Sequence, residues 1–391
     1  MKILMLCEFY NENLEYQENL LVKYYRKHQH EVTVITSTYE SVFDYYSDRH
    51  DKTLPAKEYF HLGAKIIKLR FSFNILKLKR YTNIYHIIQK EKPDLIYIHD
   101  IMLNLPEAVR YVKRNPNCKM IMDYHADYSN SANSWLSLNI LHKVIRKVFY
   151  LDRAKKYISK IFPIVPASTV FLHEVYKVPY ERMELLPLGA DTDLGSSVKR
   201  NGEGLIIRGK HNISPEDFVI FTGGKFQRAK KTELLIEACQ KINNKRLHLF
   251  IIGKSNEEDR IYMDHLLDIS RNNENIHFTG WLGASDVYKY LDASDIAVFP
   301  AGQSILWQQA ISMELPIIVG NTGNQSIAYL NEYNSIVILE KDEITADKIA
   351  ENILELMNNS ALYENMKKGA RKITEKCLNW DKLILQTLQF N

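Results

Sequence analysis

Short apolar runs alternate with amphipathic helical stretches along almost the whole chain. Each run has the length of a strand that is buried on both faces of a sheet. In the first half such runs lie at residues 2–7, 31–36, 64–70, 94–99, 119–124 and 162–168, with helical patterns at 17–29, 82–91 and 105–114. The second half repeats the scheme, with runs at 218–223, 248–253, 275–280, 295–300, 316–320 and 335–339. This alternation predicts an α/β protein with two Rossmann-like domains, each built on a doubly wound parallel sheet, facing a cleft.

The boundary between the two domains is expected in a stretch that lacks periodicity and is rich in Gly, Asp and Ser, LGADTDLGSS followed by RNGEG. We therefore predict an N-terminal domain over 1–190, a linker over 191–210 and a second domain over 211–370. Residues 371–391 have a helical pattern around Trp380 and end without a strand, which predicts a helix that crosses back to the first domain. A chain of 391 residues exceeds the usual limit for one hydrophobic core, which agrees with two domains.

The composition is that of an ordinary soluble globular protein, with 46% hydrophobic and 25% charged residues. No apolar run reaches the ~18 residues of a membrane-spanning helix. The first residues lead directly into a strand pattern rather than into a signal peptide, so we expect a cytoplasmic protein. Four scattered cysteines without a CxxC pair argue against disulfides and against a zinc site.

The net charge of +4 says little about partners, but the distribution of basic residues says more. Residues 142–160, HKVIRKVFYLDRAKKYISK, combine many Lys and Arg residues and a single Asp with apolar residues at near-helical spacing. This pattern predicts a basic amphipathic helix, which suits an anionic membrane surface at the inner face of the membrane. It equally suits a domain helix with a solvated basic face. The stretch belongs to no nucleic-acid-binding module, so we expect no nucleic acid partner.

The segment FVIFTGGKFQRAKKTELLIEA, residues 218–238, predicts an anion-binding site. It reads as a buried strand, a glycine turn at Gly223 and Gly224, and an amphipathic helix, with Lys225 and Lys230 flanking the helix start. Main-chain amides at a helix N-terminus and nearby lysines bind phosphate groups. The alternative is that the lysines only form a solvated turn.

Polar residues in the first half form a second candidate site. His125, with Asp127 nearby, follows the predicted strand 119–124, and His99 ends the preceding strand. Parallel sheets bind ligands at the carboxyl ends of their strands, so His125 is a candidate catalytic residue that Asp127 would orient. The entry to the first helix carries polar residues that would meet an acceptor or phosphates, unless they only cap the helix: Tyr16, Gln17, Glu18 and Asn19.

Taken together and in order, these motifs resemble the two-domain GT-B glycosyltransferases, in particular the large retaining family numbered 4, over nearly the whole chain. GGKFQRAKK looks like the family's Gly-Arg-x4-Lys element, with Lys225 and Lys230 at the two basic positions. The resemblance implies that these lysines and Gly224 hold the donor diphosphate and stabilise the leaving group. It also implies a hinge at LLPLGADTD, a nucleotide base near Gly280, Trp281 and Leu282, and a His125 near the transferred sugar.

The chain departs from this family at its most specific element, a Glu-x7-Glu pair. The aligned stretch FPAGQSILWQQAISMELPIIV places Ala301 and Gln309, or Gln308 after a shift of one residue, at the glutamate positions. Glutamine can still accept a hydrogen bond from a ribose hydroxyl, although it carries no charge. We expect sugar contacts from Gln303, Ser304 and the backbone of Ile305 instead. The alternative is a helix with incidental polar residues.

The resemblance implies a retaining transferase that needs no metal and no cofactor. It would move a sugar from a nucleotide-diphosphate donor, expected to be a UDP-sugar, to a saccharide or lipid-linked acceptor, in surface polysaccharide or glycoconjugate biosynthesis. His99 and residues 16–19 are the expected acceptor contacts. Two alternatives stay open: a non-catalytic subunit, motivated by the missing glutamates, and a nucleotide-sugar epimerase, which needs acid/base carboxylates such as Glu18 and Asp127.

Overall fold

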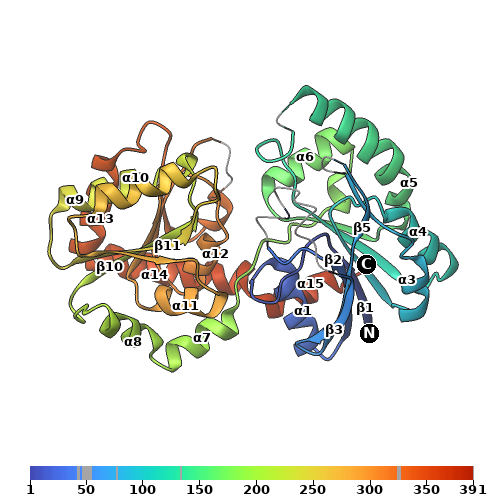
Figure 1. Cartoon of the computed structure of the whole chain (residues 1–391), viewed down its shortest axis with the longest axis horizontal. Helices are drawn as coiled ribbons and strands as arrows, with labels where there is room; N and C mark the ends of the chain where they lie inside the picture. Colours follow the sequence, from blue (N-terminus) through green and yellow to red (C-terminus); the bar gives the residue numbers. More distant parts are fainter. Residues whose placement is uncertain (42–44, 46–54, 76–77, 133, 324–326, 391) are drawn as a thin grey trace. The chain divides into compact units, whose positions relative to one another are not determined.

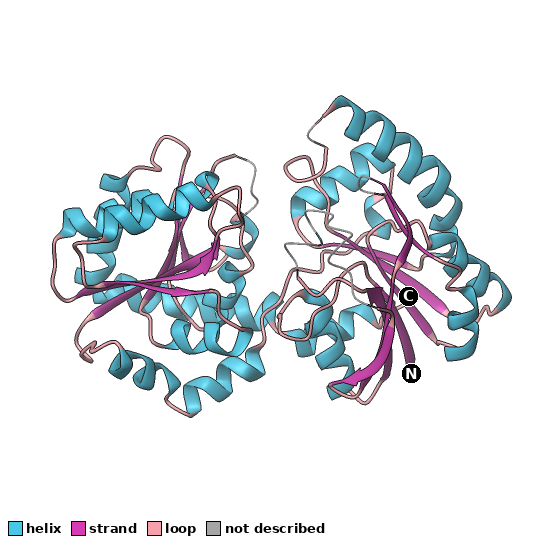
Figure 2. Ribbon diagram, in the orientation of Figure 1, coloured by secondary structure: helices cyan, strands magenta, loops and turns pink. Residues whose placement is uncertain are grey.

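The computed structural model describes residues 1–41, 45, 55–75, 78–132, 134–323 and 327–390. The chain divides into two compact units (Figure 1). Unit 1 comprises Met1–Leu188 together with Trp380–Asn391, and unit 2 comprises Gly189–Asn379. In each unit helices cover both faces of a central sheet, as Figure 2 shows. The predicted fold class, two doubly wound α/β domains, is confirmed.

The described part of unit 1 contains a seven-stranded sheet with the order β3-β4-β2-β1-β7-β8-β9. All neighbours are parallel except β3 and β4. From β4 onward the order is that of a Rossmann fold, 3-2-1-4-5-6. The strands are β1 (Lys2–Leu6), β2 (Glu31–Ser37), β3 (Lys57–His61), β4 (Ala64–Leu69), β7 (Leu95–His99), β8 (Lys119–Tyr124) and β9 (Lys160–Pro163), and a separate hairpin contains β5 (Phe71–Ile75) and β6 (Leu78–Tyr81).

Successive residues of β1 enter two different cores, because side chains alternate across a sheet. Ile3 and Met5 pack with α1 and the C-terminal α15, whereas Leu4 and Leu6 pack with the helices of the other face. A strand buried on both faces is apolar throughout, which is why the sequence pattern predicted it correctly. The helices of unit 1 are α1 (Gln17–Lys27), α3 (Tyr85–Glu91), α4 (Leu105–Arg114), η2 (Ser137–Leu151), α5 (Asp152–Ala154), η3 (Lys155–Tyr157), α6 (Pro166–Tyr176), η4 (Tyr180–Arg182) and α15 (Trp380–Thr387).

Unit 2 has a parallel sheet with the order β12-β11-β10-β13-β14-β15, which is again 3-2-1-4-5-6. Its strands are β10 (Phe218–Lys225), β11 (Leu247–Lys254), β12 (Ile276–Gly280), β13 (Ile296–Phe299), β14 (Ile317–Gly320) and β15 (Ile336–Leu339). Its helices are α7 (Thr192–Arg200), α8 (Glu203–Lys210), η5 (Arg228–Lys230), α9 (Thr232–Ile242), α10 (Arg260–Ser270), α11 (Ala284–Asp292), α12 (Leu306–Ser312), η6 (Ala328–Leu330), α13 (Ala346–Asn358), α14 (Ser360–Ile373) and η7 (Thr374–Leu378).

The predicted linker at 191–210 is wrong, because these residues form α7 and α8 of unit 2. Asp191 caps α7 by accepting a hydrogen bond from the main-chain N–H of Leu194 at 3.0 Å. Two of the glycines in this stretch, Gly195 and Gly204, serve close packing. A Cβ on Gly204 would come within 2.5 Å of the main chain of Asp292, and one on Gly195 within 2.8 Å of Met313 Sδ.

Two other element boundaries differ from the prediction. The run at 162–168 ends as a strand at Pro163, and Pro166 then begins α6, since proline is favoured in the first turn of a helix. Near the C-terminus, helical structure continues in unit 2 to Leu378. The chain returns to unit 1 at Trp380. There the hydroxyl groups of Tyr25 and Thr387 are hydrogen-bonded to each other at 2.7 Å.

The predicted single basic helix over 142–160 is replaced by η2, α5, η3 and the first residue of β9. η2 has a π-type pattern at its end, where the Asp152 N–H donates to the Lys147 carbonyl. Part of the positive charge of residues 142–160 is neutralised, because Lys147 and Lys155 both pair with the carboxylate of Asp152 at 2.8 Å. Across the described ranges, no helix is long and apolar enough to span a bilayer.

Candidate functional site

Four neighbouring parallel strands of unit 2 bring polar groups to one edge of the sheet. The order β12-β11-β10-β13 places Trp281, Lys254 and Lys225, and then the loop 300–305, next to one another at the carboxyl ends. Ligands of doubly wound sheets bind at this edge. Of these residues, Lys254 was not predicted, although it ends an apolar strand with a Gly-Lys pair just as Lys225 does.

The glycines before Lys225 do not make the predicted sharp turn. β10 continues through Lys225 and pairs with β11 as far as Lys254. A Cβ on Gly223 would lie 2.5 Å from the carbonyl oxygen of Ile252, so glycine allows the two strands to approach. Gly224 has φ +126°, which side-chain-bearing residues rarely adopt.

Lys230 lies against the loop that follows β13. Its Nζ donates a hydrogen bond to the carbonyl oxygen of Gln303 at 2.5 Å. The side chain passes over Gly302, where a Cβ would come within 2.8 Å of Lys230 Cδ. Burial, and then the positive charge of Lys225, lower the pKa of Lys230 to about 8. Burial also lowers the pKa of Lys225. Two desolvated ammonium groups near each other are stabilised when an anion binds between them.

The first N–H of α9 has a partner within the protein. It belongs to Thr232 and donates to the hydroxyl of Tyr262 at 2.8 Å. This N–H is therefore not available to a phosphate, and the lysine side chains are the charged groups at this edge.

Both glutamines of α12 are buried. Gln308 and Gln309 are 1% and 5% exposed, and the Gln308 amide lies 3.5 Å from the Tyr329 hydroxyl. The prediction that Gln308 binds the donor is thus not supported by its position. Ala301 is also buried.

The residues before α12 remain accessible. Gln303 is exposed, and Ser304 is half-buried with its Oγ 3.3 Å from the Leu306 N–H. Ile305 is the N-cap of α12. The predicted sugar contacts at Gln303, Ser304 and Ile305 therefore lie together beside Lys230.

The loop after β12 carries the predicted base contacts. Gly280 has φ +75°, and Trp281 is 38% exposed beyond it. The Lys254 ammonium lies 6.0 Å from the centre of a Trp281 ring. Leu282 packs partly into the core of unit 2 and so supports this loop. An accessible indole beside lysines suits the stacking of a nucleotide base.

Unit 1 has its own cluster at the carboxyl ends of β7 and β8. The two strands pair in a register that sets His99 beside Asp123. Asp123 is completely buried, and its carboxylate accepts hydrogen bonds from Tyr97 Oη at 2.9 Å and His99 Nδ1 at 3.0 Å. His125 Nε2 lies 3.5 Å from the same carboxylate oxygen, and the two imidazole centres are 4.1 Å apart. Asp123, rather than the predicted Asp127, therefore orients both histidines.

His99 is held in its charged form. Its Nε2 lies 3.1 Å from Glu18 Oε1, so each ring nitrogen faces a carboxylate. Burial acts to lower the pKa of His99, but the negative charges of Asp123 and Glu18 outweigh it and raise the pKa to about 10. In turn, the charges of His99 and His125 overcome burial and hold the pKa of Asp123 well below its usual range.

Among the described residues, the geometry of this cluster could hold a metal ion. His99, Asp123 and His125 each offer one ligand atom, and these three atoms lie within 4.8 Å of one another. A metal ligand must be the neutral imidazole. The raised pKa of His99 therefore opposes metal binding, and the residues fit a charged hydrogen-bond network better than a metal site.

Asp127 has a structural role, whereas the sequence predicted that it orients His125. Its carboxylate accepts hydrogen bonds from the Ser129 N–H at 2.7 Å and the Asn130 N–H at 3.1 Å. It thereby closes the turn after His125. Its assignment as a catalytic residue is therefore not supported.

The predicted acceptor residues at the start of α1 have separate partners. Glu18 joins the His99 cluster, and the Gln17 amide lies 3.5 Å from the Tyr97 hydroxyl. Asn19 donates to the Asn11 carbonyl at 2.9 Å, and Tyr16 packs with Phe9 and Tyr39. Glu18 and Gln17 therefore border the cluster, whereas Asn19 and Tyr16 hold the preceding loop.

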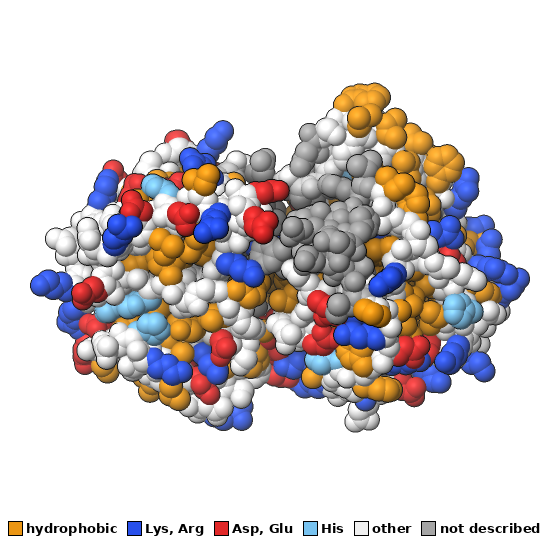
Figure 3. Space-filling model, viewed as in Figure 1, with side chains coloured by type: hydrophobic (Ala, Val, Ile, Leu, Met, Phe, Trp, Pro, Cys, Tyr) orange, Lys and Arg blue, Asp and Glu red, His pale blue; other side chains and the backbone are white. Residues whose placement is uncertain are grey.

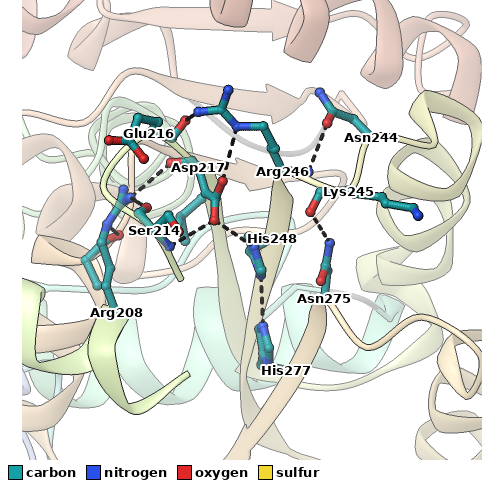
Figure 4. Close-up of polar contacts among 12 residues, drawn as sticks. Arg208, Ser214, Glu216, Asp217, Asn244, Lys245, Arg246, His248, Asn275 and His277 are labelled. Atoms are coloured by element: carbon teal, nitrogen blue, oxygen red, sulfur yellow. Dashed lines mark hydrogen bonds and ion pairs between the residues drawn. The ribbon is translucent and has the colours of Figure 1, made fainter. Parts of the chain in front are cut away.

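A further polar network lies at the opposite, amino-terminal edge of the unit 2 sheet (Figure 4). Asp217 lies 3.5 Å from His248 Nε2, and His248 Nδ1 lies 3.3 Å from His277 Nε2. Burial, and then the charges of His211 and His248, lower the pKa of His277 to about 4. His248 lies at the start of β11, whereas Lys254 lies at its end. The network is therefore at the edge opposite to the candidate ligand site.

Sequence comparisons cover both units. Residues 19–194 match the family described as Glycosyltransferase Family 4, and residues 205–373 match Glycosyl transferases group 1. A curated relative from Rickettsia bellii is 22% identical over 337 residues, which are 80% of this chain and 90% of that protein. It is named UDP-N-acetylglucosamine–N-acetylmuramyl-(pentapeptide) pyrophosphoryl-undecaprenol N-acetylglucosamine transferase.

Solved structures show the same fold over the full length. Sucrose-phosphate synthase from Thermosynechococcus elongatus has a TM-score of 0.67 at 15% identity, covering 99% of this chain and 97% of that one. HepE from Anabaena, solved with UDP and glucose, has a TM-score of 0.66 at 14% identity, covering 99% and 98%. With both halves matched by these families and this fold, the chain belongs to the family 4-like, group 1 glycosyltransferases with the GT-B fold.

Proposed function

We propose that the protein is a retaining transferase that uses a UDP-sugar and a saccharide or lipid-linked acceptor, in the biosynthesis of a surface polysaccharide or glycoconjugate. The observation that carries the proposal is the carboxyl edge of the unit 2 sheet. There, Lys225 and Lys230 adjoin the accessible Gln303–Ser304 loop, with Trp281 two strands away. In this proposal the base, diphosphate and sugar contacts follow one another along the edge in the order in which a nucleotide sugar carries these groups.

The two lysines would stabilise the leaving group. Cleavage of the anomeric bond develops negative charge on the diphosphate, so their attraction is stronger in the transition state than in the ground state. Burial, followed by the positive charge of Lys225, lowers the pKa of Lys230 to about 8, so an anion beside it would stabilise its charged form. The positive charge from Lys225 and Lys230 supports a reaction without a bound metal. In this proposal the acceptor hydroxyl attacks on the leaving-group face, and a donor phosphate oxygen takes its proton.

In unit 1, we assign the transferred sugar or the acceptor to the cluster around Asp123. His125 would donate to a sugar hydroxyl, while His99 and Glu18 border the place that the acceptor takes. Asp123 is a positioning residue, because it is completely buried and acts through the histidines. The lipid-linked acceptor class draws on the Rickettsia bellii relative, whose name includes pyrophosphoryl-undecaprenol.

The non-catalytic alternative rests on one observation, the replacement of the family's glutamate pair by Ala301 and Gln309. Neither side chain carries a charge and both are buried, so neither replaces a glutamate carboxylate at the ligand edge. This arrangement leaves diphosphate binding intact, since that depends on the lysines. Turnover therefore has to be measured separately from binding.

The test is a thermal-shift and hydrolysis screen with UDP-, GDP-, ADP- and CMP-sugars in the presence of EDTA. Stabilisation by a UDP-sugar together with release of UDP supports the proposal, and Lys230→Ala should strongly weaken both effects while the exposed Arg228→Ala retains them. Binding without turnover, even with lipid-linked and saccharide acceptors, would identify a non-catalytic protein. Epimerised sugar nucleotide formed without an acceptor would identify an epimerase.

A further inference from the structure

Helix η2 carries an apolar ridge that faces solvent. Leu136, Ile140, Val144 and Val148 recur every four residues and therefore share one face of the helix. Leu136 and Val148 are 66% and 46% exposed, and Trp135, which precedes the ridge, is 69% exposed. Figure 3 shows hydrophobic side chains, in orange, gathered over the region that the helix preceding α5 occupies in Figure 1. We call Trp135 and these four residues the ridge.

A basic groove lies next to the ridge, between α4 and the end of η2. Its volume is about 290 Å³. It is lined by Pro106, Val109, Arg110, Lys113, Phe149, Tyr150, Arg153 and Ala154. Phe149 lines the groove and directly follows Val148 of the ridge, and both side chains are about half exposed, at 49% and 46%, so groove and ridge adjoin on the surface of unit 1.

The three cations of the groove are held in place by aromatic rings rather than by carboxylates. Arg110 Cζ lies 4.3 Å from the centre of the Tyr85 ring, and Arg153 Cζ lies 5.5 Å from that of Phe149. Lys113 Nζ lies 5.3 Å from the centre of the Tyr157 ring. Cation–π contacts fix a charged group without neutralising it.

The acidic residues of the same helices are already paired with other cations. Glu107 accepts from Arg80 at 2.8 Å, and Asp152 pairs with Lys147 and Lys155. Within the described residues, the groove cations Arg110, Lys113 and Arg153 have no ion pair with a carboxylate. The groove thus concentrates positive charge beside exposed apolar side chains.

We infer that this surface docks on a bilayer containing anionic phospholipids. The ridge would enter the interfacial region, and Arg110, Lys113 and Arg153 would bind lipid phosphates in the groove. An apolar face rich in Trp and Leu beside Lys and Arg is the pattern of helices that lie in a membrane interface. The location differs from a uniform basic helix over 142–160, because Lys147 and Lys155 share the carboxylate of Asp152, and Arg110 and Lys113 come from α4.

A second copy of the chain fits this surface less well. A two-fold dimer through the ridge would place the same patch of both copies face to face. The three uncompensated cations of one copy would then oppose those of the other, whereas anionic phosphates complement them. The surface belongs to unit 1 and contains none of the proposed donor contacts, so the inference does not depend on the proposed function.

The test is co-sedimentation of the full chain with phosphatidylcholine vesicles that contain 0 or about a third phosphatidylglycerol. We expect binding to the anionic vesicles that weakens with added salt. The groove variant Arg110→Gln/Lys113→Gln/Arg153→Gln should bind on the order of a hundredfold more weakly, at about fivefold for each basic residue lost. Its control, Lys90→Gln/Lys119→Gln/Lys177→Gln, removes three exposed lysines outside the groove and should bind within about threefold of the wild type.

The ridge has its own matched pair of variants. Leu136→Gln/Ile140→Gln/Val144→Gln should weaken binding about tenfold or more, because it removes the apolar area that enters the membrane. Phe60→Gln/Val170→Gln/Leu385→Gln changes equally exposed residues of unit 1 and should have little effect.

Absence of vesicle binding by the wild type, or equal loss in test and control variants, would overturn the inference. So would a wild-type dimer in light scattering that the ridge variant converts to a monomer. Retained stabilisation by UDP in the groove and ridge variants would show that the donor site is separate.

Discussion

The ammonium group of Lys230 donates a hydrogen bond to the main-chain carbonyl of Gln303, with 2.5 Å between nitrogen and oxygen. This contact joins the turn after β10 to the loop after β13, both at the carboxyl edge of the unit 2 sheet. Main-chain oxygen is a weaker partner for an ammonium group than a phosphate oxygen is. The lysine is therefore held in position for a diphosphate that would replace or share this bond.

Lys230→Ala should raise the Kd for UDP about ten- to a hundredfold, which corresponds to one lost hydrogen bond between charged groups. Arg228→Ala is the control, because Arg228 is an exposed cation on the same short turn. Isothermal titration calorimetry of both variants measures the effect. Equal losses in the two variants would mean that only the overall charge of the turn matters, and not the position of Lys230.

Binding of UDP should weaken as the pH rises above 8. The free protein has a Lys230 pKa of about 8, and an anion stabilises the charged ammonium and so raises this pKa in the complex. Above pH 8, binding therefore requires uptake of a proton, and the Kd rises by up to about tenfold per pH unit. Lys230→Arg should reduce this dependence, because arginine stays charged and only Lys225, whose pKa burial also lowers, still titrates. Titrations between pH 7 and 9.5 in buffers of different ionisation enthalpy would detect the proton. An unchanged Kd over this range would contradict the coupling.

Trp281→Ala should raise the Kd for UDP while leaving the Kd for inorganic pyrophosphate unchanged. The exposed indole lies at the end of β12, and stacking of a base on an aromatic ring contributes about 1–3 kcal/mol. Trp281→Phe keeps a ring and should retain most of the affinity. If both ligands lost affinity to the same extent, the tryptophan would support the loop rather than contact the base.

Much of the architecture could be predicted from the sequence, because strands buried on both faces are apolar without interruption. Lys225, at the end of β10, could be located in the same way. The functional difference between Asp123 and Asp127 could not, although they are only four residues apart. It depends on the register of β7 with β8, which sets His99 beside Asp123, and on a turn that occupies the carboxylate of Asp127.

The linker was predicted wrongly for a related reason. Glycine and aspartate are signals of flexible loops, but here Asp191 caps a helix and Gly204 allows α8 to pack on the main chain of Asp292. Close packing by glycine depends on a partner nearly ninety residues away in the chain, about which local composition carries no information.

Asp123→Asn should destabilise unit 1 far more than Asp127→Asn, although both carboxylates are buried. Asp123 is the counter-charge of a protonated His99, and removing one partner of a buried charge pair costs about 3–5 kcal/mol. Asp127 accepts hydrogen bonds that close a turn, a role worth about 1 kcal/mol. Urea unfolding of the two variants compares these costs. Similar unfolding free energies would show that His99 is not charged in the folded protein.

The protein should lose stability as the pH falls from 6.5 toward 4, partly through His277. Its folded pKa of about 4 is below the ordinary value of 6.5, so the unfolded chain binds the proton more readily. This contribution is therefore complete above pH 6.5 and disappears as the pH falls through this window. Between pH 7 and 5 we expect a loss of about 1 kcal/mol in the free energy of unfolding, after allowing for solvent screening of a partly exposed ring.

His277→Phe should flatten the change in melting temperature over this range, because a phenyl ring packs beside Phe250 without titrating. His265→Phe, an exposed histidine of α10, should leave it as in the wild type. Equal slopes for wild type and His277→Phe would place the acid sensitivity elsewhere in the chain.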